Sequence, residues 1–91
     1  MVTAIVLINA KRERIAAAAQ EILAVEGITE IYSVAGDWDL VAVARVRHND
    51  DLARLVTEDL IRVGGITRTN TLVAFRQYSR HDLERMFGLG M

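Results

Sequence analysis

The chain has no cysteine and no proline among its 91 residues, and only 5% of them are aromatic. The absence of cysteine excludes disulfide bonds, thiolate zinc sites and a cysteine nucleophile. No apolar run reaches the roughly 20 residues of a membrane-spanning helix, and the N-terminus lacks the basic region of a secretory signal. We therefore expect one soluble domain over residues 1–91, located in the cytoplasm.

Neither sign of charge predominates. Eleven Lys and Arg residues stand against twelve Asp and Glu residues, which gives a net charge of −1. Proteins that bind nucleic acids draw much of their affinity from basic residues that contact phosphates, so direct nucleic-acid binding is disfavoured. Hydrophobic residues make up 52% of the chain and charged residues 25%, a composition typical of chains that fold.

Hydrophobic patterns between the glycines predict alternating strands and helices. Strands are predicted at residues 2–8, 28–35, 38–46 and 66–78, the second and third joined by a two-residue hairpin turn at Gly36-Asp37. One helix is predicted over residues 11–26, with Asn9 as N-cap and Gly27 as C-terminal cap. A second helix begins at Asn49 and ends at Gly64-Gly65. A capping pair of Ser79 and Asp82 predicts a short C-terminal helix that carries Leu83, Met86 and Phe87.

This order, βαββαβ with right-handed crossovers, predicts an α+β, ferredoxin-like fold with a four-stranded antiparallel sheet and both helices on one side. The strands at 2–8, 38–46 and 66–78 are nevertheless predicted to be apolar on both faces, and a domain this short is marginally stable alone. An identical sheet from a second copy is the simplest cover for the other face. We therefore expect a homodimer, a dimeric α/β-barrel-type assembly, or a larger oligomer.

Asp37 and Asp39 are the closely spaced carboxylates beside a glycine turn. Such a pair can act in acid–base catalysis, contact a small polar ligand or simply build the turn. No further metal ligand lies nearby in sequence, so no metal site is expected. His48 and His81 have no serine or acid at a triad spacing and are expected to lie on the surface.

Thr67, Thr69 and Thr71 alternate along the last predicted strand. Their hydroxyls could bind the polar groups of a small molecule, or they could be there because threonine is a good strand residue. Trp38 is either a core anchor or the wall of a ligand pocket. Phosphate-binding loops, dinucleotide fingerprints, zinc spacings and nucleophile elbows are absent. We therefore expect neither an enzyme nor a cofactor.

Two segments resemble a known family. The segment VAGDWDL at residues 34–40 is similar to the glycine-aspartate turn in the effector-binding domain of Lrp/AsnC-type regulators. The segment GITRTNTLV at residues 65–73 resembles the last strand of that domain, with threonines at alternate positions. The two motifs occur in the family's order with a helix between them, and the resemblance covers the chain from Val2 to about Tyr78.

The resemblance implies an amino-acid-sensing domain, often called the RAM domain, that acts in transcriptional regulation, dimerises through its sheets and assembles into octamers of four dimers. Family ligands lie between dimers, near the glycine-aspartate turn. In this sequence Gly36 would allow close backbone approach, Asp37 and Asp39 would face an α-amino group or order the loop, and Trp38 would border the side-chain pocket. The implied ligand-binding set is completed by Thr69 and Thr71, which would supply hydroxyls or shape the pocket wall.

The chain departs from the family in one respect. Family regulators carry a helix-turn-helix DNA reader before this domain, whereas here the first strand starts at Val2. The expectation is therefore a stand-alone sensor without direct DNA binding, one that could co-assemble with full-length relatives.

Two other functions remain open, a cofactor-free enzyme such as an oxygenase on the same dimeric scaffold, and a purely structural oligomerisation module. The substitution Asp39→Ala is expected to abolish the ligand response of a sensor, and to leave the stability and assembly of a structural module nearly unchanged.

Overall fold

The computed structural model describes residues 1–80. Within this range the strands and helices follow the predicted βαββαβ order. The strands are β1 (Val2–Ala10), β2 (Ile28–Ser33), β3 (Leu40–Val46) and β4 (Ile66–Val73). The first helical region comprises the 3-10 turn η1 (Arg12–Arg14) and α1 (Ile15–Leu23). The second comprises α2 (Asn49–Arg54), the π-helical turn η2 (Leu55–Asp59) and the 3-10 turn η3 (Leu60–Arg62).

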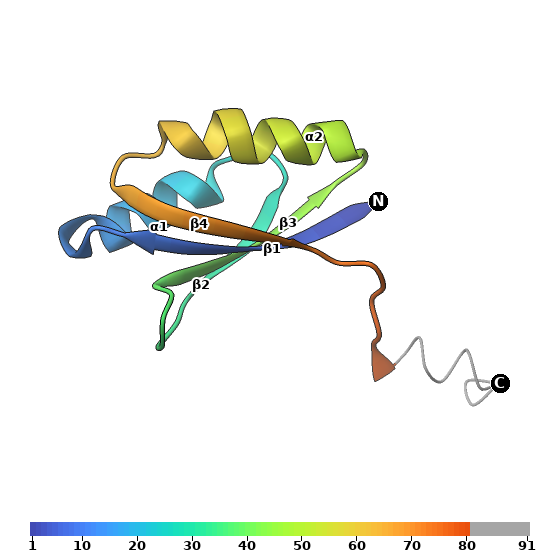
Figure 1. Ribbon diagram of the computed structural model, residues 1–91, viewed down its shortest axis with the longest axis horizontal. Helices are drawn as coiled ribbons and strands as arrows, with labels where there is room; N and C mark the ends of the chain where they lie inside the picture. Colours follow the sequence, from blue (N-terminus) through green and yellow to red (C-terminus); the bar gives the residue numbers. More distant parts are fainter. Residues whose placement is uncertain (81–91) are drawn as a thin grey trace, which may run out of the picture.

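The four strands form one antiparallel sheet in the order β2-β3-β1-β4. Both helical regions pack on the same side of this sheet and share one core, and the second region is seen above the sheet in Figure 1. The predicted ferredoxin-like fold is therefore confirmed. No helix of residues 1–80 is long and apolar enough to cross a membrane.

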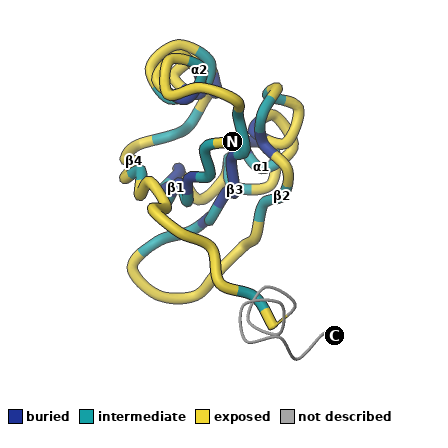
Figure 2. Tube along the Cα trace, turned by 90° about the vertical axis from the view of Figure 1, so that its right-hand side faces the viewer, coloured by how far each residue is buried: buried dark blue, intermediate teal, exposed yellow. Residues whose placement is uncertain are grey.

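The core lies between the helices and one face of the sheet. Alternate residues of the two central strands are buried on that face, because successive strand side chains point to opposite sides. Figure 2 shows this alternation along β1. In β3, Leu40, Ala42 and Ala44 are buried on this face, and Val43 on the other face is buried as well. Helical residues complete the core, with Ala18 and Ile22 from α1 and Leu52, Leu55 and Leu60 from the second region.

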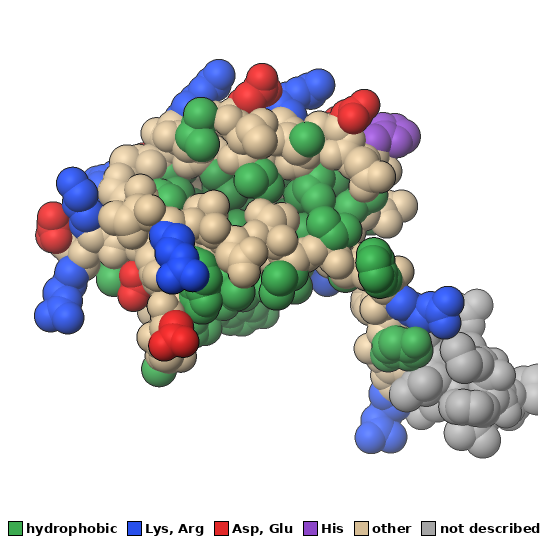
Figure 3. All heavy atoms as spheres, viewed as in Figure 1, with side chains coloured by type: hydrophobic (Ala, Val, Ile, Leu, Met, Phe, Trp, Pro, Cys, Tyr) green, Lys and Arg blue, Asp and Glu red, His purple; other side chains and the backbone are tan. Residues whose placement is uncertain are grey.

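The opposite face of the sheet, which we call the open face, carries apolar side chains that no helix of residues 1–80 covers. Cross-strand partners share a face, and the strand register places these residues there: Ile5, Leu7, Tyr32, Val41, Val43 and Leu72. Tyr32 is 51% exposed and Leu72 48%. Hydrophobic side chains line the lower side of the sheet in Figure 3. The two apolar faces predicted for β1 and β3 are thus present. The same prediction is wrong for most of β4, where residues 67–71 are all polar.

The connection between β2 and β3 is longer than predicted. The strands pair antiparallel as expected, but β2 ends at Ser33 and β3 begins at Leu40, so residues 34–39 form a loop. The backbone N–H of Val34 donates to the carbonyl of Asp39 at 3.0 Å and closes this loop. The prediction of a two-residue turn at Gly36-Asp37 is therefore wrong. Both residues, and Trp38 with them, lie within the longer loop of residues 34–39.

The first helix is shorter than predicted at both ends. Asn9 is not an N-cap, because it belongs to β1 and its side-chain oxygen accepts the backbone N–H of Asp39 at 3.0 Å. Nor is Gly27 the C-cap, since Ala24 occupies that position. Gly27 turns the chain into β2 with a φ of 100°, a value that favours glycine.

The second helix begins at Asn49, as predicted. The carboxylate of Asp51 accepts the backbone N–H of His48 at 3.2 Å, which satisfies one donor at the helix start. Hydrogen bonding then changes to the wider π-helical pattern in η2 before the region ends ahead of Gly64. His48 is exposed, as expected.

The last strand ends five residues earlier than predicted, at Val73 instead of Tyr78. Beyond it the chain leaves the sheet, and the side chains of Phe75 and Tyr78 are exposed. The prediction failed because the alternation of apolar residues continues beyond the pairing with β1: the strands are antiparallel, Val73 already lies opposite Ala4 near the start of β1, and the N–H of Ala74 donates to the carbonyl of Thr3 at 2.9 Å. The predicted C-terminal helix, with Leu83, Met86 and Phe87, lies outside the described residues, as does His81.

Candidate functional site

Asp39 is fixed by the backbone of β1. Its carboxylate oxygen Oδ2 accepts the N–H of Ala10 at 3.0 Å, and its own N–H donates to the carbonyl of Ile8 and to Oδ1 of Asn9, each at 3.0 Å. The register of β1 with β4 shifts between Asn9 and Ala10. The carboxylate thus accepts a strand donor at an irregular point in the sheet, so its role is at least partly structural.

Trp38 is in contact with the guanidinium group of Arg68. The guanidinium carbon of Arg68 is 4.5 Å from the centroid of the indole ring, within the range of a cation–π interaction. Arg68 belongs to β4 and is the cross-strand partner of Asn9. Trp38 and Asp39 therefore both lie at the C-terminal end of β1, one linked to β4 and the other to β1 itself.

Thr69 and Thr71 lie on the opposite face from Arg68. Their partners in β1 are Ile8 and Val6, which are fully buried beneath the helices. Thr67 lies between Ile66 and Arg68, the partners of Ala10 and Asn9, and so has no direct partner of its own. The predicted ladder of three threonines is therefore interrupted at Thr67 by the register shift, although Thr67 and Thr69 line the same hollow.

A hollow of about 260 Å³ lies between β4 and the end of the second helical region. Its walls are mostly apolar, from Val56, Leu60, Ile61, Val63 and Ile66, and it is completed by Thr67, Arg68 and Thr69. Of the six residues that the sequence indicated, this hollow contains only Thr69.

Gly36 and Asp37 are exposed in the loop between β2 and β3. Gly36 has a φ of 122°, and a side chain added there would meet nothing within 4 Å. The glycine is therefore required by the backbone conformation and not by close packing within this chain. Asp37 has no ion pair or hydrogen bond to another side chain within residues 1–80.

The six predicted residues thus separate into three groups: an exposed loop tip, the Trp38–Asp39 end of β1, and two threonines on the helix side of β4. Sequence reasoning missed Arg68 and Asn9, which connect Trp38 and Asp39 to the sheet. The sequence did contain a signal for Arg68. Arg68 lies between Thr67 and Thr69 in the last strand, so its side chain is expected on the face opposite the threonines. For that face the prediction named only apolar residues.

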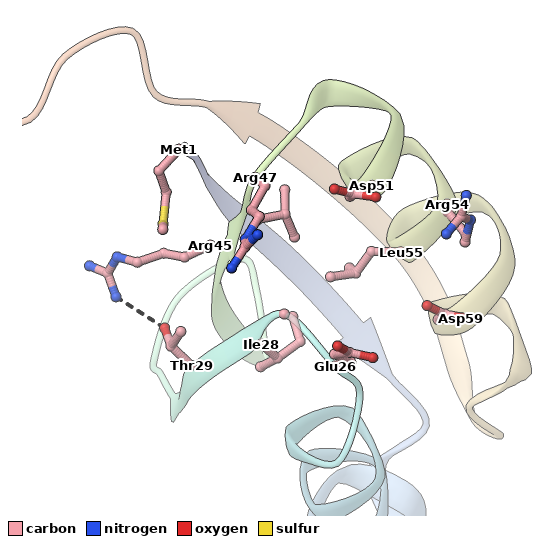
Figure 4. A pocket seen from close by; sticks show the side chains of 12 residues that line it. Met1, Glu26, Ile28, Thr29, Arg45, Arg47, Asp51, Arg54, Leu55 and Asp59 are labelled. Carbon is pink, nitrogen blue, oxygen red and sulfur yellow. Dashed lines mark hydrogen bonds between the residues drawn. The ribbon is translucent and has the colours of Figure 1, made fainter.

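A larger hollow of about 570 Å³ lies at the other end of the domain, between the start of β2, the end of β3 and α2 (Figure 4). None of the six predicted residues lines it. Several of its charged groups already have structural partners. Arg45 contacts Thr29 and Glu30, and Arg54 is paired with Glu58. Within the described part of the chain no group of three or more acidic or histidine side chains could hold a metal ion.

The chain is similar to known proteins over most of its length. The family model described as the Lrp/AsnC ligand binding domain matches residues 3–83. A relative from Pyrococcus furiosus, named as an uncharacterised HTH-type transcriptional regulator, is 33% identical over 72 residues, which are 79% of this chain and 48% of the relative. The chain spans about half or less of the length of the curated relatives that it matches.

Solved structures show the same fold. TTHA0845 from Thermus thermophilus is 40% identical, with a TM-score of 0.82, over 88% of this chain and 100% of that one. The feast or famine regulatory protein of M. tuberculosis, solved in complex with L-methionine, is 22% identical with a TM-score of 0.71, over 88% of this chain and 54% of that one. At that identity the likeness concerns the fold.

Proposed function

Because this chain belongs to the Lrp/AsnC ligand-binding domain family, we propose that it is a sensor of amino acids whose assembly is linked to effector binding. The match of the family model over residues 3–83 is the observation that carries this proposal. The M. tuberculosis protein of the same fold, solved with L-methionine, supports a free amino acid as the class of effector. The curated relatives, named as transcriptional regulators, support a role in gene regulation.

We propose that the functional unit is a homodimer formed through the open face. Two half-exposed side chains on that face, Tyr32 and Leu72, lie beside the apolar residues of β1 and β3. Burying such a face removes apolar surface from water and stabilises a domain of this size. From the family resemblance we further propose that dimers associate, up to an octamer, with the effector bound between dimers near the β2–β3 loop and Asp37.

The net charge of −1 favours a sensor that does not itself hold DNA. We propose that the chain influences transcription by co-assembling with a longer, DNA-binding relative. Mixing the purified chain with such a regulator and measuring the mass of the complex tests it. Separate homo-oligomers in that mixture would contradict it.

The first experiment is a thermal-shift screen against the twenty amino acids, with oligomeric mass followed by light scattering in the same buffers. A ligand that binds only the folded protein raises its melting temperature. A selective shift accompanied by a change in mass is the expected result. No shift with any amino acid, at a constant dimeric mass, would favour a structural oligomerisation module.

The structure indicates that Asp37, and not Asp39, is the better residue to substitute in this screen. Asp39→Ala removes the acceptor for Ala10, so its effect on ligand binding would be mixed with a loss of stability. Asp37→Asn is the cleaner variant, because Asp37 is exposed and has no side-chain partner in the described residues. An enzyme on this scaffold, the other alternative, would consume the amino acid, and chromatography of the incubated mixture would reveal this.

A further inference from the structure

We propose that Arg68, held over the ring of Trp38, is the anchor for the carboxylate group of the effector. This inference rests on the proposed function and adds to it a residue that the sequence motifs did not indicate.

The geometry of the pair leaves the guanidinium able to bind an anion. The guanidinium carbon of Arg68 lies over the indole ring, 4.5 Å from its centroid. The N–H groups of arginine lie in the guanidinium plane and form a fork that matches a carboxylate. The contact with Trp38 restricts the side chain, and the guanidinium has no side-chain hydrogen bond or ion pair within residues 1–80.

Arg68 differs from several other arginines of the chain in its ion pairing. Arg14 pairs with Glu21, Arg45 with Glu30 and Arg54 with Glu58. No carboxylate of residues 1–80 lies within ion-pair distance of Arg68, although Asp39 directly follows the tryptophan on which it stacks. Instead of turning toward Arg68, Asp39 uses an oxygen to accept the N–H of Ala10.

The surroundings of Arg68 are polar and lie at the end of the open face. Its cross-strand partner is Asn9, and the next residue of β4 on the same face is Asn70. The apolar residues Ile5, Leu7 and Leu72 lie farther along the same face. A second copy that covers the apolar part would leave Arg68 at the margin of the interface, where a small anion has access.

The loop before Trp38 can supply the opposite charge. Asp37 is adjacent to Trp38 in the chain, is exposed and has no ion pair in the described residues. A free amino acid carries both charges at neutral pH. We therefore assign its carboxylate to Arg68 and its ammonium group to the side of Asp37.

Trp38 makes this inference directly measurable, since it is the only tryptophan of the chain. The probes are the twenty free L-amino acids, titrated while Trp38 emission is recorded. The amino acid with the largest response is then compared with its own α-carboxamide, which keeps the side chain and the amino group but lacks the carboxylate charge. The dissociation constants are confirmed by calorimetry, because substitutions beside the ring also change its emission.

We expect Arg68→Gln to weaken binding of the free amino acid by about 10- to 100-fold, the effect of losing a charged hydrogen-bond partner. The carboxamide should bind the Arg68→Gln variant and the unaltered protein about equally. Arg68→Lys should fall between them, because lysine keeps the charge but not the fork. Arg12→Gln, which removes an exposed arginine of η1, is the matched control and should bind as the unaltered protein does.

Equal affinity of the unaltered protein and Arg68→Gln for the amino acid would overturn the assignment of Arg68 while leaving the sensor function intact. So would a variant that loses dimer mass in light scattering but keeps its affinity, since Arg68 would then be an interface residue. Absence of binding by the unaltered protein to all twenty amino acids would instead overturn the proposed function, and the inference with it.

Discussion

The carboxylate of Asp39 accepts the backbone N–H of Ala10 at 3.0 Å, at the point where the register between β1 and β4 shifts. A bulge leaves a strand donor without its regular partner, and this side chain supplies the acceptor. Ala10 is buried, so the loss of this acceptor would leave an unpaired donor in the core. The aspartate of the glycine-aspartate motif therefore contributes to the fold.

We expect Asp39→Ala to lower the free energy of unfolding by about 1 to 3 kcal/mol, the cost of leaving a buried donor unpaired. Asp39→Asn keeps a side-chain oxygen at the same place and should cost less. Urea denaturation of both variants, followed by circular dichroism, provides the comparison. Equal stability of Asp39→Ala and the unaltered protein would show that water replaces the carboxylate.

The glycines at positive φ allow a second test. Gly36 and Gly65 have φ values of 122° and 94°, but only Gly65 is closely packed, since a Cβ there would lie 2.6 Å from Cβ of Arg14. Gly36→Ala should cost about 1 to 3 kcal/mol through backbone strain alone. Gly65→Ala should cost clearly more, because the clash falls on the least flexible part of the arginine side chain.

Thermal unfolding of the two alanine variants, at equal protein concentration, measures this difference. If both variants lost the same stability, the contact with Arg14 would be of no consequence, and the backbone conformation alone would explain the requirement for glycine at residue 65.

The fold was largely predictable from the sequence, and the site only in part. Periodicity alone places the strands and helices, because burial on one face repeats every two or 3.6 residues. It does not show which polar side chain meets which backbone group. Asn9 has the residue type of a helix cap, yet its oxygen accepts a hydrogen bond from the loop 30 positions away. Likewise, only the register shift reveals that Thr67 has no direct partner in β1.

The proposed dimer predicts a specific sensitivity of the open face to charge. We expect Leu72→Lys to shift the protein toward monomer, because the substitution places an ammonium group within an apolar interface. Ile61→Lys is the control, since Ile61 is 72% exposed and belongs to η3, on the helix side of the sheet. Light scattering after size-exclusion chromatography measures both masses. Dissociation by Ile61→Lys but not by Leu72→Lys would place the interface on the helices.

The last prediction concerns Tyr32, whose hydroxyl donates to Oε2 of Glu30 at 2.5 Å on the open face. This hydrogen bond, together with the negative charge of Glu30, raises the pKa of Tyr32 above its usual 10.0, while Arg45 acts in the opposite direction. A pKa raised by folding means that the neutral phenol stabilises the folded state. This stabilisation is fully present below the unfolded pKa and disappears as the pH rises through the folded one.

An alkaline titration followed by tyrosinate absorbance tests this. Subtracting the titration curve of the Tyr32→Phe variant removes the contribution of the second tyrosine, Tyr78. The difference curve should have its midpoint above 10.0, and Glu30→Gln should move it down, because the amide lacks the charge that opposes ionisation. Since Glu30 also pairs with Arg45, the Arg45→Gln variant should move the midpoint up. A midpoint that is unaffected by both substitutions would show that neither charge acts on the phenol.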